Sequence, residues 1–175
     1  MRFAIIGNSG SGKSTLAQEL ASLHRLASLD LDTIAWEPGK VAEPREPAAA
    51  CSDVARFCNS NQRWVIEGCY ASLMKIALLH APALLFIDPG REACLANCRD
   101  RPWEPHKYKS KQAQDEKLEF LLRWVREYYR RHDDQSLSAH QDLFQGYPGP
   151  KRKLTRRVER NEMEDLKSLC LNAGH

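Results

Sequence analysis

Eight residues near the start of the chain have the composition of a phosphate-binding loop. They follow the pattern Gly-x-x-x-x-Gly-Lys-Ser at every fixed position, and a threonine comes directly after them. In such a loop the glycines let successive backbone N–H groups turn inward onto phosphate oxygens. The lysine then reaches the β- and γ-phosphates, and the serine hydroxyl ligates Mg²⁺. The residues that this pattern assigns to the phosphate site are Gly7, Asn8, Ser9, Gly10, Ser11, Gly12, Lys13, Ser14 and Thr15.

The sequence on either side of the loop predicts the strand and the helix that such a loop needs. Residues 2–6 form a short apolar run typical of a buried parallel strand, and leucines recur at helical spacing over residues 13–24. The helix start adds its positive dipole end to the phosphate site. The chain has no Asn-Lys-x-Asp guanine motif and no apolar strand ending in Asp-Glu. We therefore expect ATP with Mg²⁺, and not a motor ATPase.

Acidic residues follow the predicted strands, at the edge where open parallel sheets bind ligands. Asp30 and Asp32 follow the second predicted strand, Glu67 the third and Asp88 the fourth. We expect Asp32 to be catalytic, either by accepting a proton from an acceptor hydroxyl or by holding a water of Mg²⁺. We expect Glu67 to hold another such water, so that Ser14 and Glu67 form the metal site. A turn before a helix explains Asp88 equally well.

Positive charge is concentrated in the second half of the chain. Residues 1–98 carry nine basic and ten acidic side chains, residues 99–131 carry ten and six, and residues 149–160 carry six and one. A transferring phosphoryl group needs cationic donors, and nucleic acid would also suit this bias. An exposed charged helix face that pairs with glutamates is the alternative. The candidate phosphate-binding arginines at the end of the helix predicted over residues 92–101 are Arg99 and Arg101, and we expect Arg99 to contact the substrate. On the helix predicted over residues 118–129, we expect Arg123 and Arg126 to be catalytic lid arginines.

Strands and helices alternate along the whole chain, which predicts a parallel sheet with helices on both faces. Residues 102–116 are polar, basic and without periodicity. We expect one domain over residues 1–175. The expected strands are 2–6, 29–31, 64–66, 84–87 and, weakly, 151–157. The expected helices are 13–24, about 50–59, 73–79, 92–101, 118–129, 135–145 and one that begins with an Asn161/Glu164 capping box.

Composition excludes several classes of protein. The chain has 175 residues, of which 42% are hydrophobic and 28% are charged, with a formal net charge of +3. These values are typical of a globular protein and not of a disordered tail or a fibre. No apolar run approaches the ~20 residues of a membrane helix, and the start lacks the pattern of a signal peptide. We expect a cytoplasmic protein without a membrane partner, whose six cysteines are free thiols.

Three segments together resemble the DNA topology modulation protein family. They are residues 2–16, Leu31-Asp32-Thr33 with Trp36, and residues 63–70. The family consists of small P-loop proteins related to adenylate kinase and shikimate kinase. The resemblance implies a three-layer α/β/α P-loop NTPase fold, similar to nucleoside monophosphate kinases, with a five-stranded parallel sheet. It also implies an acceptor-binding segment near residues 33–60 and a lid near residues 99–131.

The same resemblance implies roles for individual residues. Asp32 would face the acceptor substrate, and Arg45 would be an acceptor-site arginine. Glu67 and Gly68 would stand at the Asp-Gly position that orients the waters of Mg²⁺. The chain departs from the family there, because Glu67 replaces the usual aspartate and Cys69 the usual asparagine.

These observations predict ATP- and Mg²⁺-dependent phosphoryl transfer to a small-molecule acceptor. Nucleoside monophosphates, shikimate-like alcohols and polyols are all candidate acceptors. The alternatives are a slow ATPase without an acceptor, and an ATP-binding regulator that acts on DNA topology through the basic C-terminal half. The sequence has no recognisable helix-turn-helix or zinc finger. It predicts no oligomeric state.

Overall fold

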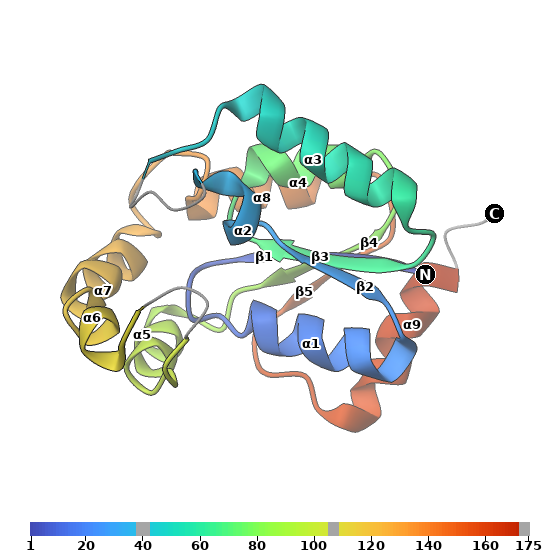
Figure 1. The fold of residues 1–175 in the computed structure, drawn as a ribbon. Helices are drawn as coiled ribbons and strands as arrows, with labels where there is room; N and C mark the ends of the chain where they lie inside the picture. Colours follow the sequence, from blue (N-terminus) through green and yellow to red (C-terminus); the bar gives the residue numbers. More distant parts are fainter. Residues whose placement is uncertain (38–42, 105–108, 172–175) are drawn as a thin grey trace.

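Five parallel strands form the centre of the molecule (Figure 1). The computed structural model describes residues 1–37, 43–104 and 109–171. The strand order is β2-β3-β1-β4-β5, and each neighbouring pair is parallel. The predicted fold class is confirmed, although the fifth strand ends at residue 154 and not at 157. The strands are β1 (Arg2–Gly7), β2 (Ala27–Asp30), β3 (Trp64–Gly68), β4 (Ala83–Ile87) and β5 (Lys151–Leu154).

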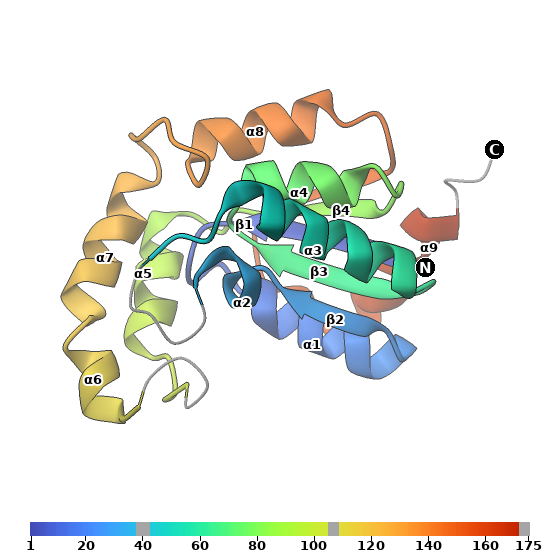
Figure 2. The ribbon, with the colours of Figure 1, turned by 45° about the horizontal axis from the view of Figure 1, so that its top comes forward.

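Helices cover both faces of the sheet, as the alternation of elements predicts (Figures 1 and 2). Successive residues of a strand point to opposite faces. In β1, Ala4 and Ile6 pack in one core cluster and Phe3 and Ile5 in the other. The first face carries α3 (Pro47–Ser60), α4 (Ala71–Leu78) and α8 (Leu137–Gly146). The second carries α1 (Lys13–His24) and α9 (Met163–Leu171).

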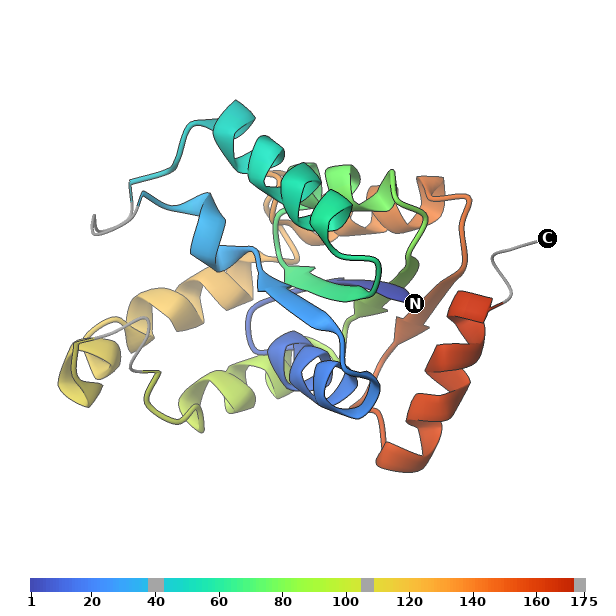
Figure 3. The ribbon, with the colours of Figure 1, turned by 45° about the vertical axis from the view of Figure 1, so that its right-hand side comes forward.

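Three further helices lie beyond the carboxyl ends of the strands, at one side of the molecule (Figures 1 and 3). They are α5 (Arg91–Arg99), α6 (Lys111–Asp115) and α7 (Leu118–Glu127). Helices α5 and α7 share a small apolar cluster of their own, formed by Cys94, Leu95, Cys98, Leu122 and Val125. This cluster fixes the two helices against each other at the edge where the sheet presents its ligand-binding residues.

The structure corrects the sequence interpretation in four places. A short helix, α2 (Asp32–Ala35), occupies part of the expected loop after β2, and α6 lies within residues 102–116. Strand β3 continues through Gly68, so Glu67 lies within the strand and not after it. The capping box before α9 belongs to Glu159 and Glu162 in a 3₁₀ turn, η1 (Arg160–Glu162), and not to Asn161 and Glu164. A glutamate side chain accepts the capping hydrogen bond there, a role that sequence patterns assign mainly to shorter polar residues.

All six cysteines are free thiols, as expected. No helix in the described part of the chain is both long and apolar enough to span a membrane. Residues 38–42, which contain a proline and a glycine, lie outside the described part of the chain. Tyr108, within the expected lid segment, lies outside it as well.

Candidate functional site

The predicted phosphate-binding loop joins the end of β1 to the start of α1. Gly12 caps the helix with a left-handed backbone, at φ 94° and ψ 10°, which a glycine adopts without strain. The first N–H groups of a helix have no partner within the helix, so this end of α1 offers donors to an anion. The Lys13 amine is buried and donates a hydrogen bond of 2.8 Å to the Asn8 carbonyl. The loop is therefore already folded around its own lysine.

Helix α5 and helix α7 hold the loop from outside. Asn97 of α5 donates a hydrogen bond of 2.8 Å to the Gly10 carbonyl. The Asn8 side chain donates one of 3.1 Å to the carbonyl of Val125 in α7. The sequence analysis did not predict a role for Asn97, because a single asparagine within a helix belongs to no motif that indicates a contact with the loop.

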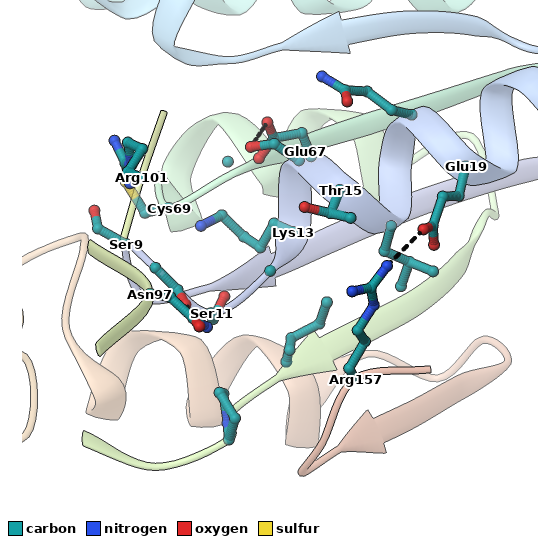
Figure 4. Close-up of a pocket in the computed structure, with 18 of the residues that line it drawn as sticks. Ser9, Ser11, Lys13, Thr15, Glu19, Glu67, Cys69, Asn97, Arg101 and Arg157 are labelled. Atoms are coloured by element: carbon teal, nitrogen blue, oxygen red, sulfur yellow. Dashed lines mark hydrogen bonds and ion pairs between the residues drawn. The ribbon is translucent and has the colours of Figure 1, made fainter. Parts of the chain in front are cut away.

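A cavity of about 590 Å³ opens over the loop. It is lined by the loop and the first turns of α1, by the ends of β3 and β4, by residues 100–104 and by residues 156–158. In Figure 4, Ser9, Lys13 and Arg101 lie at one end of the cavity, and Glu19 and Arg157 lie at the other. The cavity therefore has a deep end at the loop and an outer end along α1.

The outer end is bounded by an ion pair. Arg157 follows β5 and its guanidinium lies 3.1 Å from the Glu19 carboxylate of α1. The Arg157 side chain is largely exposed, so the pair is a weak contact that a ligand can displace. Thr15 and Val158 also line the cavity. The contact between Arg157 and Glu19 was not predicted, because it joins residues far apart in the chain.

Three carboxylates gather beside the loop, as their positions after parallel strands predict. Asp30 is the last residue of β2, and its carboxylate accepts a hydrogen bond of 2.9 Å from the backbone N–H of Asp32. Asp32 is the first residue of α2 and lines the cavity. Glu67 is buried in β3 and lines the cavity as well.

The Ser14 hydroxyl donates a hydrogen bond of 2.6 Å to the Glu67 carboxylate. Burial raises the pKa of Glu67 above its ordinary value, Lys13 opposes this shift, and the nearby Asp30 adds to it. A buried carboxylate with acidic neighbours is a place where a cation is favoured. The structure thus brings Ser14 and Glu67, the two predicted metal residues, into direct contact.

Four of the predicted arginines lie outside the cavity. Arg45 pairs with Asp53 of α3 and does not line the cavity. Arg99, Arg123 and Arg126 are exposed and are not among the residues that line the cavity.

Arg101 lines the cavity instead, and it forms an ion pair of 3.0 Å with Glu104. Trp103, from the same segment, also lines the cavity and is 45% exposed. The charge bias of residues 99–131 indicated the correct region. The charge bias did not distinguish Arg101 from Arg99, because the residue at which α5 ends determines which of the two side chains lines the cavity.

Several solved structures with a similar fold are named as kinases of small molecules. The chain is similar to a shikimate kinase from Acinetobacter baumannii in complex with shikimate, with a TM-score of 0.53 and 15% identity over 99% of this chain and 94% of that one. It is similar to a shikimate kinase from Aquifex aeolicus, with a TM-score of 0.52 and 19% identity over 99% of both chains.

A gluconokinase from Sinorhizobium meliloti 1021 gives a TM-score of 0.52 and 14% identity over 98% of this chain and 93% of that one. No protein-family model and no curated protein matches the sequence. At these identities the likeness establishes the fold, which is that of shikimate-kinase-like P-loop proteins.

Proposed function

We propose that the protein transfers the γ-phosphoryl group of ATP, with Mg²⁺, to the hydroxyl of a small-molecule acceptor. One observation carries this proposal: the phosphate-binding loop, Asp32 and Glu67 line one cavity. Glu67 fits the Mg²⁺ of a bound nucleotide, and Asp32 adds a second carboxylate that can accept the proton of an acceptor hydroxyl. The likeness to shikimate kinases and a gluconokinase supports a hydroxyl acceptor.

The residues at the deep end of the cavity fit a nucleotide phosphate tail. Ser11 lines the cavity, and its buried hydroxyl has no hydrogen-bond partner among the residues that the structure describes, as expected of a polar group whose partner is a ligand or a water. The Lys13 amine rests on the Asn8 carbonyl, and a phosphate oxygen offers it a stronger, charge-assisted partner. Backbone N–H groups at the start of α1 supply the remaining donors.

The fit to Mg²⁺ rests on the contact between Ser14 and Glu67. In the described residues no three acidic, histidine or cysteine side chains converge to hold a metal by themselves. Mg²⁺ in phosphoryl-transfer sites is usually bound by one or two protein oxygens together with phosphates and waters. Ser14 and Glu67 supply oxygen of this kind. When bound, the metal neutralises charge on the phosphates.

The other residues take roles from their places along the cavity. Asp32 orients the acceptor hydroxyl and accepts its proton. Arg101 reaches the transferring phosphoryl group, a role we assign to it before Arg123 and Arg126 because it lines the cavity. The nucleoside occupies the outer end, between α1 and residues 156–158. Residues 33–60 bind the acceptor, and residues 99–131 form the lid.

The basic C-terminal segment offers less free charge to DNA than its composition indicates. Lys151 donates to two carbonyls of the chain, Lys153 pairs with Asp88, Arg156 pairs with Glu162 and Arg157 pairs with Glu19. Charge that is already paired contributes weakly to phosphate binding. A small-molecule acceptor is therefore favoured over a role in DNA topology.

The experiment compares the wild-type protein with Lys13→Ala and with Lys75→Ala, a control that removes an exposed lysine of α4 outside the cavity. Binding of ATP with Mg²⁺ is measured by titration calorimetry, and ADP release is measured with and without acceptors. We expect Lys13→Ala to lose both and Lys75→Ala to keep both. Equal ATP affinity and turnover in the wild type and in Lys13→Ala would refute the proposal.

A further inference from the structure

The carboxylate of Asp32 is held by a chain of two side-chain hydrogen bonds. The Trp36 indole Nε1–H donates to the Tyr70 hydroxyl oxygen over 2.9 Å, and the Tyr70 hydroxyl donates to Asp32 Oδ1 over 2.8 Å. From this geometry we infer that Tyr70 and Trp36 are positioning residues of the phosphoryl-transfer site, which fix the orientation and the ionised state of Asp32. The inference rests on the role proposed above for Asp32.

The direction of the chain is determined by its chemistry. An indole nitrogen can only donate, so the Tyr70 oxygen must accept from Trp36. The Tyr70 hydroxyl therefore donates its proton to the Asp32 carboxylate and does not accept a hydrogen bond from it. Burial, followed by the charge of Asp32, raises the pKa of Tyr70 well above its ordinary value. Tyr70 therefore remains protonated, and a donor to Asp32, at neutral pH.

Regular elements fix both ends of this chain. Tyr70 is 8% exposed and is the residue before α4, two positions after β3 ends. Trp36 is the residue after α2, and Asp32 is the first residue of that helix. The backbone of Asp32 is held separately, by the hydrogen bond from its N–H to Asp30. The Tyr70 hydrogen bond thus acts on the side chain of Asp32, whereas the Asp30 hydrogen bond acts on its main chain.

Trp36 also links Asp32 to the proposed acceptor-binding segment. Its backbone forms an antiparallel bridge with Pro44. Backbone hydrogen bonds lie on either side of the bridge, from the Arg45 N–H to the Ala35 carbonyl over 3.0 Å and from the Glu37 N–H to the Glu43 carbonyl. Trp36 is 36% exposed, so it lies at the border between the core and this segment.

The first test is a titration that needs no acceptor and no Mg²⁺. The protein is labelled with ¹³C at the aspartate carboxyl carbons, and the Asp32 resonance is assigned by its loss in Asp32→Asn. A hydrogen bond to the ionised form lowers the pKa of a carboxyl. We expect Tyr70→Phe to raise the midpoint of Asp32 by about one pH unit, and Trp36→Phe to raise it by less.

The matched control is Tyr147→Phe. Tyr147 is equally buried and its hydroxyl donates to the Pro82 carbonyl over 2.6 Å, so this variant loses one hydrogen bond of a buried tyrosine away from the cavity, where Tyr70→Phe loses two. We expect it to leave the Asp32 midpoint unchanged. The groups that interact electrostatically with Asp32 include Glu67 and Cys69, and Asp30 accepts a hydrogen bond from its backbone N–H; these groups are the same in all three variants.

The second test is kinetic and uses an acceptor found to stimulate ADP release. We expect Tyr70→Phe to lower kcat about tenfold, with the KM for ATP unchanged, and to shift the acidic limb of the pH profile to higher pH. A midpoint of Asp32 in Tyr70→Phe and in Trp36→Phe equal to that of the wild type would overturn the inference. If Tyr70→Phe fails to fold, Trp36→Phe decides alone. A shifted midpoint without any acceptor-stimulated turnover would support the positioning of Asp32 and refute the kinase instead.

Discussion

The contact between the phosphate-binding loop and α5 predicts that Gly10→Ala is much more harmful than Gly12→Ala. Both glycines have a left-handed backbone, at φ 75° and φ 94°. A Cβ at Gly10 would overlap the Cys94 carbonyl oxygen and lie 2.7 Å from the Cys98 sulfur, whereas a Cβ at Gly12 would meet nothing within 4 Å. The two substitutions therefore share the backbone strain and differ in the overlap.

The magnitudes follow from these two effects. Left-handed backbone in a residue with a Cβ costs about 1–2 kcal/mol, and overpacking costs about 1–3 kcal/mol more. We expect Gly12→Ala to lower the free energy of unfolding by about 1–2 kcal/mol and Gly10→Ala by about 2–5 kcal/mol. The smaller entropy of the unfolded chain stabilises both variants alike, so it cancels in the comparison.

The assay is urea unfolding of the protein without ligand, followed by circular dichroism. For equal slopes, the difference in unfolding free energy appears as a difference in midpoint, so Gly10→Ala should unfold at a distinctly lower urea concentration than Gly12→Ala. Equal midpoints for the two variants would refute the reasoning, because they would show that α5 does not press on the loop at Gly10.

Two further predictions concern buried titratable groups. His140 is fully buried, bound to the Tyr128 hydroxyl and the Cys69 carbonyl, and burial lowers its pKa from 6.5 to about 4. Below pH 6.5 the unfolded chain takes up a proton that the folded chain does not, so the free energy of unfolding should fall by about 2 kcal/mol between pH 7.5 and pH 5. His140→Gln should lose this part of the pH dependence in urea unfolding; a slope identical to that of the wild type would contradict it. Glu67→Gln keeps the size of the side chain and removes its charge. We expect it to weaken Mg²⁺-dependent turnover about 10–100-fold with little loss of stability, measured as ADP release against Mg²⁺ concentration, and an unchanged Mg²⁺ dependence would remove Glu67 from the metal site.

Local patterns in the sequence were sufficient for the architecture and for the position of the loop between β1 and α1. The alternation of apolar strands with amphipathic helices predicted the parallel sheet, and β1, β3 and β4 are buried as such strands must be. The loop from Gly7 to Thr15 was predicted because its function needs fixed residue types at fixed spacing. Asp32 and Glu67 were found because parallel strands end at one edge of the sheet.

Contacts between segments that are distant in the chain could not be predicted from local sequence patterns. Whether Arg99 or Arg101 lines the cavity depends on where α5 ends, and the choice between them and Arg123 depends on how α7 packs on α5. The ion pair of Arg157 with Glu19 joins residues that no local pattern relates. The Trp36–Tyr70–Asp32 chain has the same character, since Tyr70 is more than 30 residues away from Asp32 and Trp36 in the sequence and meets them only in the folded molecule.

The most direct measurement is ³¹P NMR of ATP and Mg²⁺ with the protein and a panel of acceptors that includes nucleoside monophosphates, shikimate-like alcohols and polyols. The account predicts that one class of acceptor gives a new phosphorylated product in equal amount with ADP. It also predicts that Asp32→Asn and Lys13→Ala do not form this product. ADP that accumulates with inorganic phosphate at the same rate whether or not an acceptor is present would contradict it.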